Sequence, residues 1–513
     1  MANSERRVSL THSPPRPERA GGSLALLGGV VLLAALASIF LAGVILRIGV
    51  TPDFPWLKAA GDWILEHGRL PATDPFSWTA AQRPWVLYQW GFEVALAALD
   101  RVAGHSGVAV VVAWAALTVY LIGPLHMAPQ RTSACLVAAV AAAVLVILSV
   151  NLSIRPMIAT SAGLLLQYVL IDRVRDGRAG LRGGCLAALL LYVAWANLHA
   201  GFVLGLGSLL LTLAGDWVER RPSDREATAW PAPLPPIQAA ALFAAAAAGS
   251  LITPYGPALH AYVASLSADT ALNGRIDELG AADFGMMQFR LFLALTVILI
   301  AALMRRRGTL RPTDLLHLTL LILATVVTAR FVVWAALYLV LLLPTAVARA
   351  WPGLAACCQS PGDRALVLGL TLVAAVSPPL LALNGVVDPV GPLCARLGAA
   401  IDAYVAARRP EDRLLTDPIS GSCMIAAAPG LPVFIDTRFD FYGGTFSERT
   451  LDALALKPGW RELLDAYGID VAILDRARPL AEALIVDPQF ATLYRDDEAV
   501  VVRRLHKRIE RPY

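Results

Sequence analysis

Charged residues are scarce in this sequence. They make up 16% of its 513 residues, whereas 57% are hydrophobic and the mean hydropathy is +0.61. A soluble protein carries roughly a quarter charged residues. The composition therefore excludes an ordinary soluble protein and indicates an integral membrane protein.

The N-terminal segment lacks the signals of a cleaved leader. Its first apolar run has about 25 residues, longer than the roughly 7–15 residues of a signal peptide, and no small-residue cleavage site follows it. We therefore expect residues 1–20 to form a disordered cytoplasmic tail, followed by a retained first transmembrane helix. The sequence also lacks solenoid-like repeats and cysteine–histidine spacings typical of metal sites.

Long apolar runs recur from residue 21 to residue 385. They predict about eleven transmembrane helices, although several runs are shorter than the roughly 20 residues that cross a hydrocarbon core. The predicted spans are 22–46, 107–124, 133–150, 156–172, 183–197, 201–217, 237–252, 289–304, 313–329, 331–348 and 365–384. We expect residues 21–385 to form one transmembrane domain.

Arginine is concentrated in every second connection between these spans. By the positive-inside rule, those connections face the cytoplasm. The N-terminus is then cytoplasmic, and a large first outer loop at 50–104 faces the opposite side, together with everything after about residue 386. This pattern predicts a multi-pass membrane protein whose C-terminal domain lies outside the cytoplasm.

The first outer loop has its own helical patterns. Residues 53–67 carry apolar and tryptophan side chains and end at Gly68, which is a helix stop signal. Residues 88–103 predict a second, more apolar helix. Both are expected to lie at the membrane surface, because tryptophan and tyrosine favour headgroup depth. The stretch PATDPFSWT between them is turn-like.

Residues 395–513 alternate between strand and helix patterns, which predicts a small α/β domain with a mostly parallel sheet. The expected strands include LLTD, PVFID and VAILD. Cys394 and Cys423 are the only cysteines that we place outside the cytoplasm, where disulfides persist. We predict that they form a disulfide, although a buried free thiol at Cys423 is an alternative.

Polar residues gather at the outer ends of the predicted spans. Ionisable groups in a membrane are costly and usually face protein or water. One cavity open to the outer side explains their shared depth, although each residue alone also fits a structural role, such as a helix cap for Asp53 or an Asx-turn for Asp74. The set comprises Asp53, Asp74, Glu93, Asn151, Arg155, Asn197, His199, Thr253, Tyr255, Asp277, Glu278, Arg290 and Arg330.

Several short motifs follow one another in a fixed order along the chain. They are Pro52-Asp53 with Trp56, Asp74-Pro75-Phe76-Ser77 with Thr79, Trp90 and Glu93, Arg155-Pro156, Asn197 with His199 and Gly201, Pro254-Tyr255-Gly256, and Phe434-Ile435-Asp436 with Arg438. In this order they resemble the GT-C superfamily of membrane glycosyltransferases, and more closely the RgtA-like bacterial type. Three positions depart from the family pattern: Leu57, Gly91 and Thr253 stand where it has histidine, leucine and asparagine. The resemblance implies a bacterial inner membrane, with the C-terminal domain in the periplasm.

The resemblance implies transfer of a sugar from a polyprenyl phosphate to an acceptor hydroxyl, with inversion at the anomeric carbon. Asp53 is then the first choice for the general base, and Asp74 and Glu93 are further catalytic candidates that could share a metal or orient the acceptor. The resemblance leaves open a divalent metal ion.

The departing phosphate suits fixed cationic donors, for which Arg155, Arg330 and His199 are the candidates. The expected substrate-binding residues are Trp56, Trp90, Asn197, Tyr255 and Glu278. The implied partners are a polyprenyl-phosphate-linked sugar, a glycan, lipid or protein acceptor, and the lipid bilayer, with no nucleic acid.

Two other functions fit a chain of this kind. A transporter or flippase for a lipid-linked substrate predicts inverted repeats and polar groups near the bilayer midplane. The span interiors here are instead rich in alanine, leucine and valine. A non-catalytic membrane scaffold, whose exported domain binds a partner, is the third hypothesis.

Overall fold

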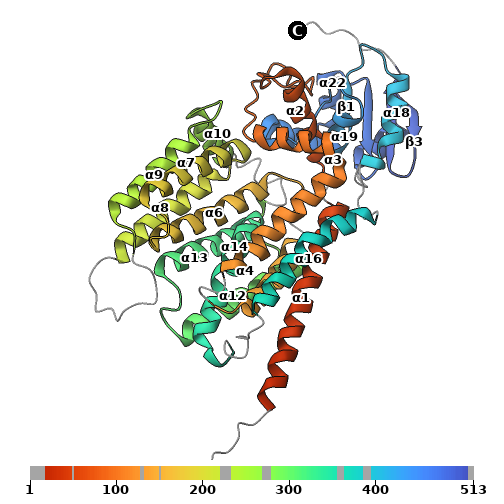
Figure 1. Cartoon of the computed structure of the whole chain (residues 1–513). Helices are drawn as coiled ribbons and strands as arrows, with labels where there is room; N and C mark the ends of the chain where they lie inside the picture. Colours follow the sequence, from red (N-terminus) through yellow and green to blue (C-terminus); the bar gives the residue numbers. More distant parts are fainter. Residues whose placement is uncertain are drawn as a thin grey trace, which may run out of the picture.

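The computed structural model describes residues 18–48, 51–127, 132–149, 152–219, 233–268, 279–354, 363–384 and 394–505. Most of the expected N-terminal tail, together with Glu278, lies outside the described residues. A helical bundle forms the larger part of the molecule, and a small domain with a β-sheet lies at one end of it (Figure 1).

The bundle is built from helices that begin at Glu18 and end at Leu383 (Figure 1). Their bounds are α1 Glu18–Ile48, α2 Phe54–His67, α3 Trp90–Leu117, η1 Thr118–Ile122, α4 Gly123–Met127, α5 Ala134–Leu148, α6 Met157–Arg175, α7 Leu181–Leu198, α8 Phe202–Glu219, α9 Pro236–Ser250, α10 Ala258–Ala268, α12 Met287–Arg305, α13 Pro312–Val327, η4 Ala329–Phe331, α14 Val332–Ala350 and α16 Asp363–Leu383.

Each predicted span coincides with an apolar helix. Within the described residues, seven helical segments are long and apolar enough to cross a bilayer, and α5, α8, α9 and α13 supply shorter apolar helices at the remaining four places. The prediction of a multi-pass α-helical membrane protein with a small C-terminal α/β domain is confirmed.

The helix α14 forms the centre of the bundle. In the most apolar stretch of the segment Ala329–Ala350, which contains α14, 89% of the residues are buried inside the protein. The helix packs against α5, α12 and α13. It is apolar on all sides, as a helix surrounded by other helices requires. By contrast, only 33% of the residues are buried in the most apolar stretch of α16.

The first loop contains the two predicted helices. The helix α2 ends at His67, and the next residue, Gly68, has a positive φ of 65° and donates its N–H to the carbonyl of Ile64. The second predicted helix is the first part of α3, from Trp90 to the kink at Gly104, where the backbone is not helical (φ 65°, ψ 179°). The rest of α3 continues from this kink into the next apolar span.

The C-terminal domain contains a four-stranded sheet in the order β1-β2-β4-β3. Only β1 and β2 pair in parallel, while β4 runs antiparallel to both β2 and β3. The expectation of a mostly parallel sheet is therefore wrong. The elements are α18 Gly398–Ala407, β1 Leu414–Thr416, α19 Pro418–Ala427, α20 Phe439–Tyr442, α21 Gly444–Leu454, α22 Trp460–Tyr467, β2 Val471–Asp475, α23 Pro479–Val486, β3 Phe490–Arg495 and β4 Ala499–Arg504.

The apolar run PVFID is not a strand of this sheet. Val433 instead pairs with the first loop, through a single parallel bridge to Ser77. The Val433 N–H donates to the carbonyl of Phe76 at 2.9 Å, and the Val433 carbonyl accepts from the N–H of Trp78 at 3.1 Å. The run therefore docks the first loop onto the C-terminal domain.

The predicted disulfide between Cys394 and Cys423 is confirmed. Their Cα atoms are 5.4 Å apart, within the usual range for a bridge. The bridge joins the entrance of the C-terminal domain to α19, since Cys394 precedes α18 and Cys423 lies within α19.

We expect non-reduced, denatured protein to contain four free thiols among its six cysteines. Replacing both bridged cysteines by serine should lower the free energy of unfolding of this domain by about 3–4 kcal/mol, because the bridge closes a long loop. Thiol titration and thermal unfolding measure both effects. Six titratable thiols would contradict the bridge.

Candidate active site

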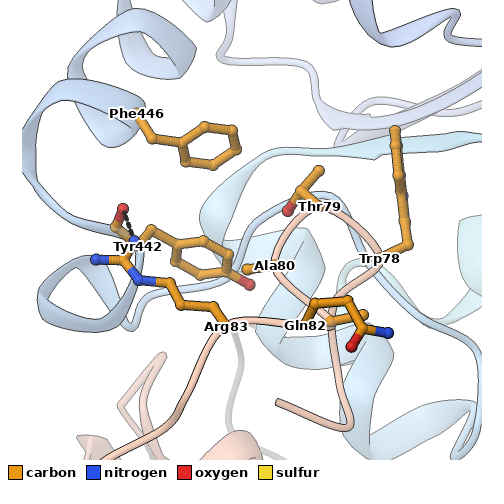
Figure 2. Close-up of a pocket in the computed structure, with 8 residues that line it drawn as sticks. Trp78, Thr79, Ala80, Gln82, Arg83, Tyr442 and Phe446 are labelled. Carbon is orange, nitrogen blue, oxygen red and sulfur yellow. Dashed lines mark hydrogen bonds between the residues drawn. The ribbon is translucent and has the colours of Figure 1, made fainter. Parts of the chain in front are cut away.

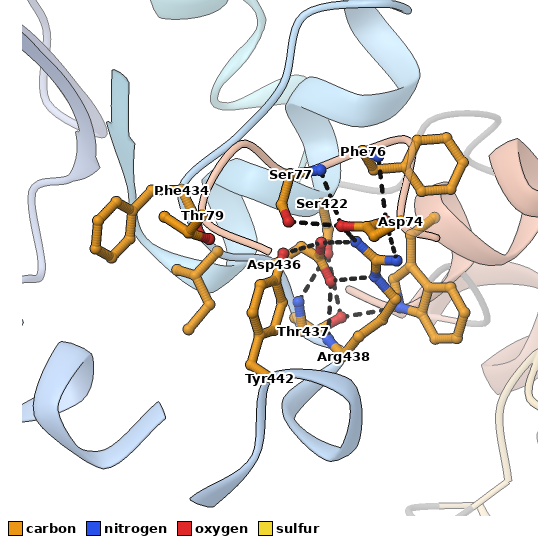
Figure 3. Close-up of polar contacts among 12 residues, drawn as sticks. Asp74, Phe76, Ser77, Thr79, Ser422, Phe434, Asp436, Thr437, Arg438 and Tyr442 are labelled. Carbon is orange, nitrogen blue, oxygen red and sulfur yellow. Dashed lines mark hydrogen bonds and ion pairs between the residues drawn. The ribbon is translucent and has the colours of Figure 1, made fainter. Parts of the chain in front are cut away.

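A buried arginine, Arg438, joins the first loop to the C-terminal domain (Figure 3). Its Nη1 and Nη2 atoms lie 2.7 Å and 3.2 Å from the two carboxylate oxygens of Asp74. Its Nε and Nη2 atoms bond to Asp436 at 2.8 Å and 2.6 Å. All three side chains are at most 1% exposed. Burial acts to lower the pKa of Arg438, but the two carboxylates raise it well above its ordinary value. Arg438 is therefore fully charged.

Asp74 also stabilises the turn formed by the residues that follow it. Its Oδ1 accepts from the N–H of Phe76 at 3.1 Å, and its Oδ2 accepts from the N–H and the hydroxyl of Ser77 at 3.0 Å and 2.5 Å. The Asx-turn that its sequence context indicates is present. Together with Arg438, these contacts enclose both carboxylate oxygens.

Asp53 stands at the N-cap position of α2, but its side chain makes no bond to the helix N–H groups. Its Oδ1 instead accepts from the hydroxyl of Thr437 at 2.6 Å, and its Oδ2 lies 2.8 Å from Nε of Arg155. The Asp53 side chain remains 21% exposed and that of Arg155 24% exposed. This ion pair therefore lies in contact with solvent where the bundle, the first loop and the C-terminal domain meet.

The direction of the Thr437 hydrogen bond follows from its neighbours. The indole Nε1 of Trp56 is only a donor, and it lies 3.1 Å from Oγ1 of Thr437. That oxygen therefore accepts from Trp56 and keeps its single proton for Asp53. The hydroxyl of Ser422 lies 3.1 Å from the same oxygen and accepts from the N–H of Thr437 at 3.3 Å. The Asp53 carboxylate is thus oriented by a side chain that is itself held in place.

Asn197 fixes the end of α7 against the first loop. Its Oδ1 accepts from Nε1 of Trp90 at 2.8 Å, and its Nδ2 donates to the carbonyls of Val193 and Ile252 at 2.7 Å and 2.9 Å. A Cβ at Gly91 would lie 2.8 Å from the carbonyl oxygen of Asn197. This close approach explains glycine at a position where the family pattern has leucine.

His199 is a neutral imidazole with a defined tautomer. Its Nδ1 accepts from the N–H of Gly201 at 3.2 Å and lies 2.6 Å from the hydroxyl of Thr160. The proton of the neutral ring is therefore on Nε2. Loss of solvent contact lowers the pKa of His199 to about 3, and the charge of Arg330 also acts to lower it. Glycine is required at 201, because a Cβ there would lie 2.0 Å from Oγ1 of Thr160.

Glu93 and Tyr255 lie close to this region. The Glu93 side chain is fully buried beside Gln89, in the neighbourhood of Asp440 and Tyr255. The Tyr255 hydroxyl accepts from the N–H of Leu87 at 2.9 Å. These contacts connect the start of α3 to the segment between α9 and α10.

The predicted site residues fall into three groups. Asp53 and Trp56 bond to Thr437, and Arg155 pairs with Asp53. Asp74 instead belongs to the cluster around Arg438. The third group comprises Glu93, Trp90, Asn197, His199, Tyr255 and Arg330 near the start of α3 and the α7–α8 turn. Glu278 lies outside the described residues.

Sequence reasoning missed the contribution of the C-terminal domain to these groups. Thr437, Arg438 and Asp440 all follow the motif Phe434-Ile435-Asp436, so the motif itself was the available signal. Burial raises the pKa of Asp440 above its ordinary value. Asp440 is thus a further perturbed carboxyl of a kind that clusters at functional sites.

A metal site is not evident in the part of the chain that the structure describes. No group of three or more histidine, cysteine, aspartate or glutamate side chains gathers there. Asp74 and Glu93, the candidates for sharing a metal, are both buried, and both Asp74 oxygens already accept hydrogen bonds from Arg438.

Comparisons with known proteins return solved structures only. The chain is similar to ArnT from Cupriavidus metallidurans bound to undecaprenyl phosphate, with 12% identity, a TM-score of 0.42, and coverage of 94% of this chain and 98% of that one. It is also similar to the same protein in the apo state, with 12% identity, a TM-score of 0.45 and the same coverage. No protein-family model and no curated protein matches. At this identity and similarity, no activity is assigned to the chain.

We expect Arg438→Met to destabilise the contact between the first loop and the C-terminal domain by about 3–5 kcal/mol, because it leaves two buried carboxylates without a cation. Thermal unfolding and protease sensitivity of the C-terminal domain measure this. The matched control is Lys457→Met, which removes an exposed pair with Asp452 worth at most about 1 kcal/mol. Equal stability of the two variants would contradict the role of Arg438.

Proposed function

We propose that this protein is a GT-C-type glycosyltransferase, which moves a sugar from a polyprenyl phosphate to an acceptor hydroxyl at the outer face of a bacterial inner membrane. The observation that carries the proposal is the partly exposed ion pair of Asp53 and Arg155. It combines a base and a phosphate-binding cation at the junction of the helix bundle and the C-terminal domain, where a lipid donor and an aqueous acceptor can meet.

In this proposal, Asp53 is the general base. A carboxylate that removes the proton of the attacking hydroxyl contributes typically 10²–10⁴-fold to the rate. Asp53 suits this role because its two oxygens are oriented by Thr437 and Arg155 while part of the side chain stays open to solvent. The Asp74 carboxylate is fully enclosed by Arg438 and its own turn, so we assign Asp74 to holding the first loop in place.

Arg155 is the first candidate for the donor phosphate. The phosphate gains negative charge as its bond to the sugar breaks, and guanidinium binds phosphate through paired N–H groups. Inversion at the anomeric carbon remains part of the proposal, because a base and a departing phosphate on opposite sides of the sugar carbon allow direct displacement.

Arg330 and His199 supply a second set of donors. The Nε2–H of neutral His199 is the proton that remains for a ligand, because Nδ1 already accepts from Gly201. Charge from Arg330 reaches both His199 and Tyr88. We propose that this pair contacts the phosphate or sugar oxygens of the donor through hydrogen bonds rather than by proton transfer.

The remaining residues shape the site in this proposal. Trp56 orients Thr437, and the bond between Trp90 and Asn197 fixes the end of α7 against the first loop. Tyr255 holds the backbone before α3, where Glu93 is buried. We propose that Glu93 orients the acceptor and that Glu278 contributes to substrate binding.

We expect Asp53→Asn to reduce transfer of labelled sugar by at least 10²-fold, because the amide cannot take up the proton. The assay supplies purified protein in lipid with a panel of radiolabelled polyprenyl-phosphate sugars and membrane extracts as acceptors. Glu66→Gln is the control, since Glu66 lies on the same helix and its side chain is 63% exposed. Activity of Asp53→Asn above about a tenth of that of the unmodified protein would exclude Asp53 as the base.

We expect Thr437→Val to lower kcat by roughly 10- to 100-fold with little change in KM, because it removes a hydrogen bond to a charged carboxylate. Thr437→Ser keeps the hydroxyl and should retain most of the activity. This split between the two variants separates positioning of Asp53 from a general packing effect. Equal loss in both variants, or none in Thr437→Val, would contradict the positioning role.

A further inference from the structure

A cavity of about 300 Å³ lies between the first loop and the C-terminal domain, away from the Asp53 pair (Figure 2). One wall is the loop segment 78–83, and the other is formed by Tyr442 and Phe446. Figure 2 shows the two aromatic rings of the C-terminal domain on one side, Trp78 on the other, and Thr79 between them. Its size is at the lower end of ligand pockets, which hold roughly 300–1,000 Å³.

The walls of the cavity are held together by direct bonds between the two parts. The hydroxyl of Thr79 donates to the carbonyl of Phe434 at 2.6 Å, and Nε1 of Trp78 donates to the carbonyl of Leu414 at 3.0 Å. Nη1 of Arg83 donates to the carbonyl of Tyr442 at 2.6 Å. The cavity is therefore formed before a ligand arrives, which lowers the entropy cost of binding.

Aromatic faces beside polar groups give the cavity its chemistry. The rings of Tyr442 and Phe446 are stacked, with centroids 5.6 Å apart and an angle of 24° between the planes. The Gln82 side chain is exposed at the rim of the cavity. Flat apolar faces with a few convergent hydrogen-bonding groups suit a sugar ring, which presents C–H groups on its faces and hydroxyls on its edge.

The charge at the rim is positive. Arg83 is exposed. Within the described residues, the hydrogen bond of its side chain is the one from Nη1 to the Tyr442 carbonyl. Asp436, behind the wall of the cavity, accepts from the Tyr442 hydroxyl at 2.8 Å and is neutralised by Arg438. A guanidinium in this position favours a carboxylate or phosphate on the ligand.

We propose that this cavity binds an anionic sugar residue of the acceptor, which makes the acceptor a glycan. This inference rests on the proposed function and extends it to the class of acceptor. The residues 436–438 connect the cavity to the reaction site, because Asp436 bonds to Tyr442 while Thr437 bonds to Asp53. The sugar in the cavity is then one that lies away from the reacting hydroxyl of the acceptor. It binds on one side of residues 436–438, and Asp53 lies on the other side.

The test measures binding without any donor lipid, using full-length protein in lipid nanodiscs. The probe is a hyaluronan tetrasaccharide, which carries glucuronate carboxylates, and the neutral comparison is chitotetraose. We expect calorimetry or saturation-transfer NMR to detect the anionic probe at millimolar affinity or tighter. Binding of the neutral probe should be at least 10-fold weaker.

Gln82→Glu is the decisive variant, because it places a negative charge at the rim without removing any bond between the walls. We expect it to weaken binding of the anionic probe by at least 10-fold, and Phe446→Ala to weaken it as well. Arg449→Gln is the control, since this exposed arginine of α21 does not line the cavity. Absence of binding, or equal binding in Gln82→Glu and Arg449→Gln, would overturn the proposal.

These results are independent of the proposed catalytic role of Asp53. Asp53→Asn should bind the anionic probe as the unmodified protein does, because its side chain does not line the cavity. If the probe fails to bind while Asp53→Asn still abolishes transfer, only the cavity proposal fails. If the probe binds while Asp53→Asn remains active, only the assignment of the base fails.

Discussion

The charge on Arg438 is the constraint on which the arrangement of the site depends. It lies between Asp74 of the first loop and Asp436 of the C-terminal domain, and all three groups are buried. The ring of Trp85, whose centroid is 4.6 Å from the guanidinium carbon, adds a cation–π contact. Removing Arg438 leaves two buried carboxylates without their cation. The first loop and the C-terminal domain are therefore held in one relative position, which brings Thr437 into contact with Asp53.

Much of the fold could be predicted from the sequence, because hydrophobic periodicity and length are local signals. The apolar runs located the helices, and the helix stop at Gly68 was read correctly. The disulfide of Cys394 and Cys423 followed from their shared compartment. The mixed sheet was not predictable in this way, because strand direction depends on pairing between distant segments. The antiparallel pairing of β2 with β4 and the docking of Val433 onto the first loop are such long-range features.

The candidate site shows the same division. Topology placed Asp53, Arg155, His199 and Arg330 at one end of the bundle, and the structure pairs Asp53 with Arg155 and places Arg330 near His199. It did not reveal that a C-terminal residue orients Asp53, since about 380 residues separate Thr437 from it along the chain. Short sequence motifs identify which residues act together only after the fold brings them into contact.

The central claim is that Asp53 and Arg155 form a reaction centre for a lipid-linked sugar. The most direct measurement is an experimental structure of the full-length protein with a polyprenyl phosphate bound in lipid nanodiscs. The account predicts a phosphate within hydrogen-bond distance of the Arg155 guanidinium, with the Asp53 carboxylate still bonded to Thr437. A phosphate bound elsewhere, with Asp53 and Arg155 unchanged and remote from it, would contradict the account.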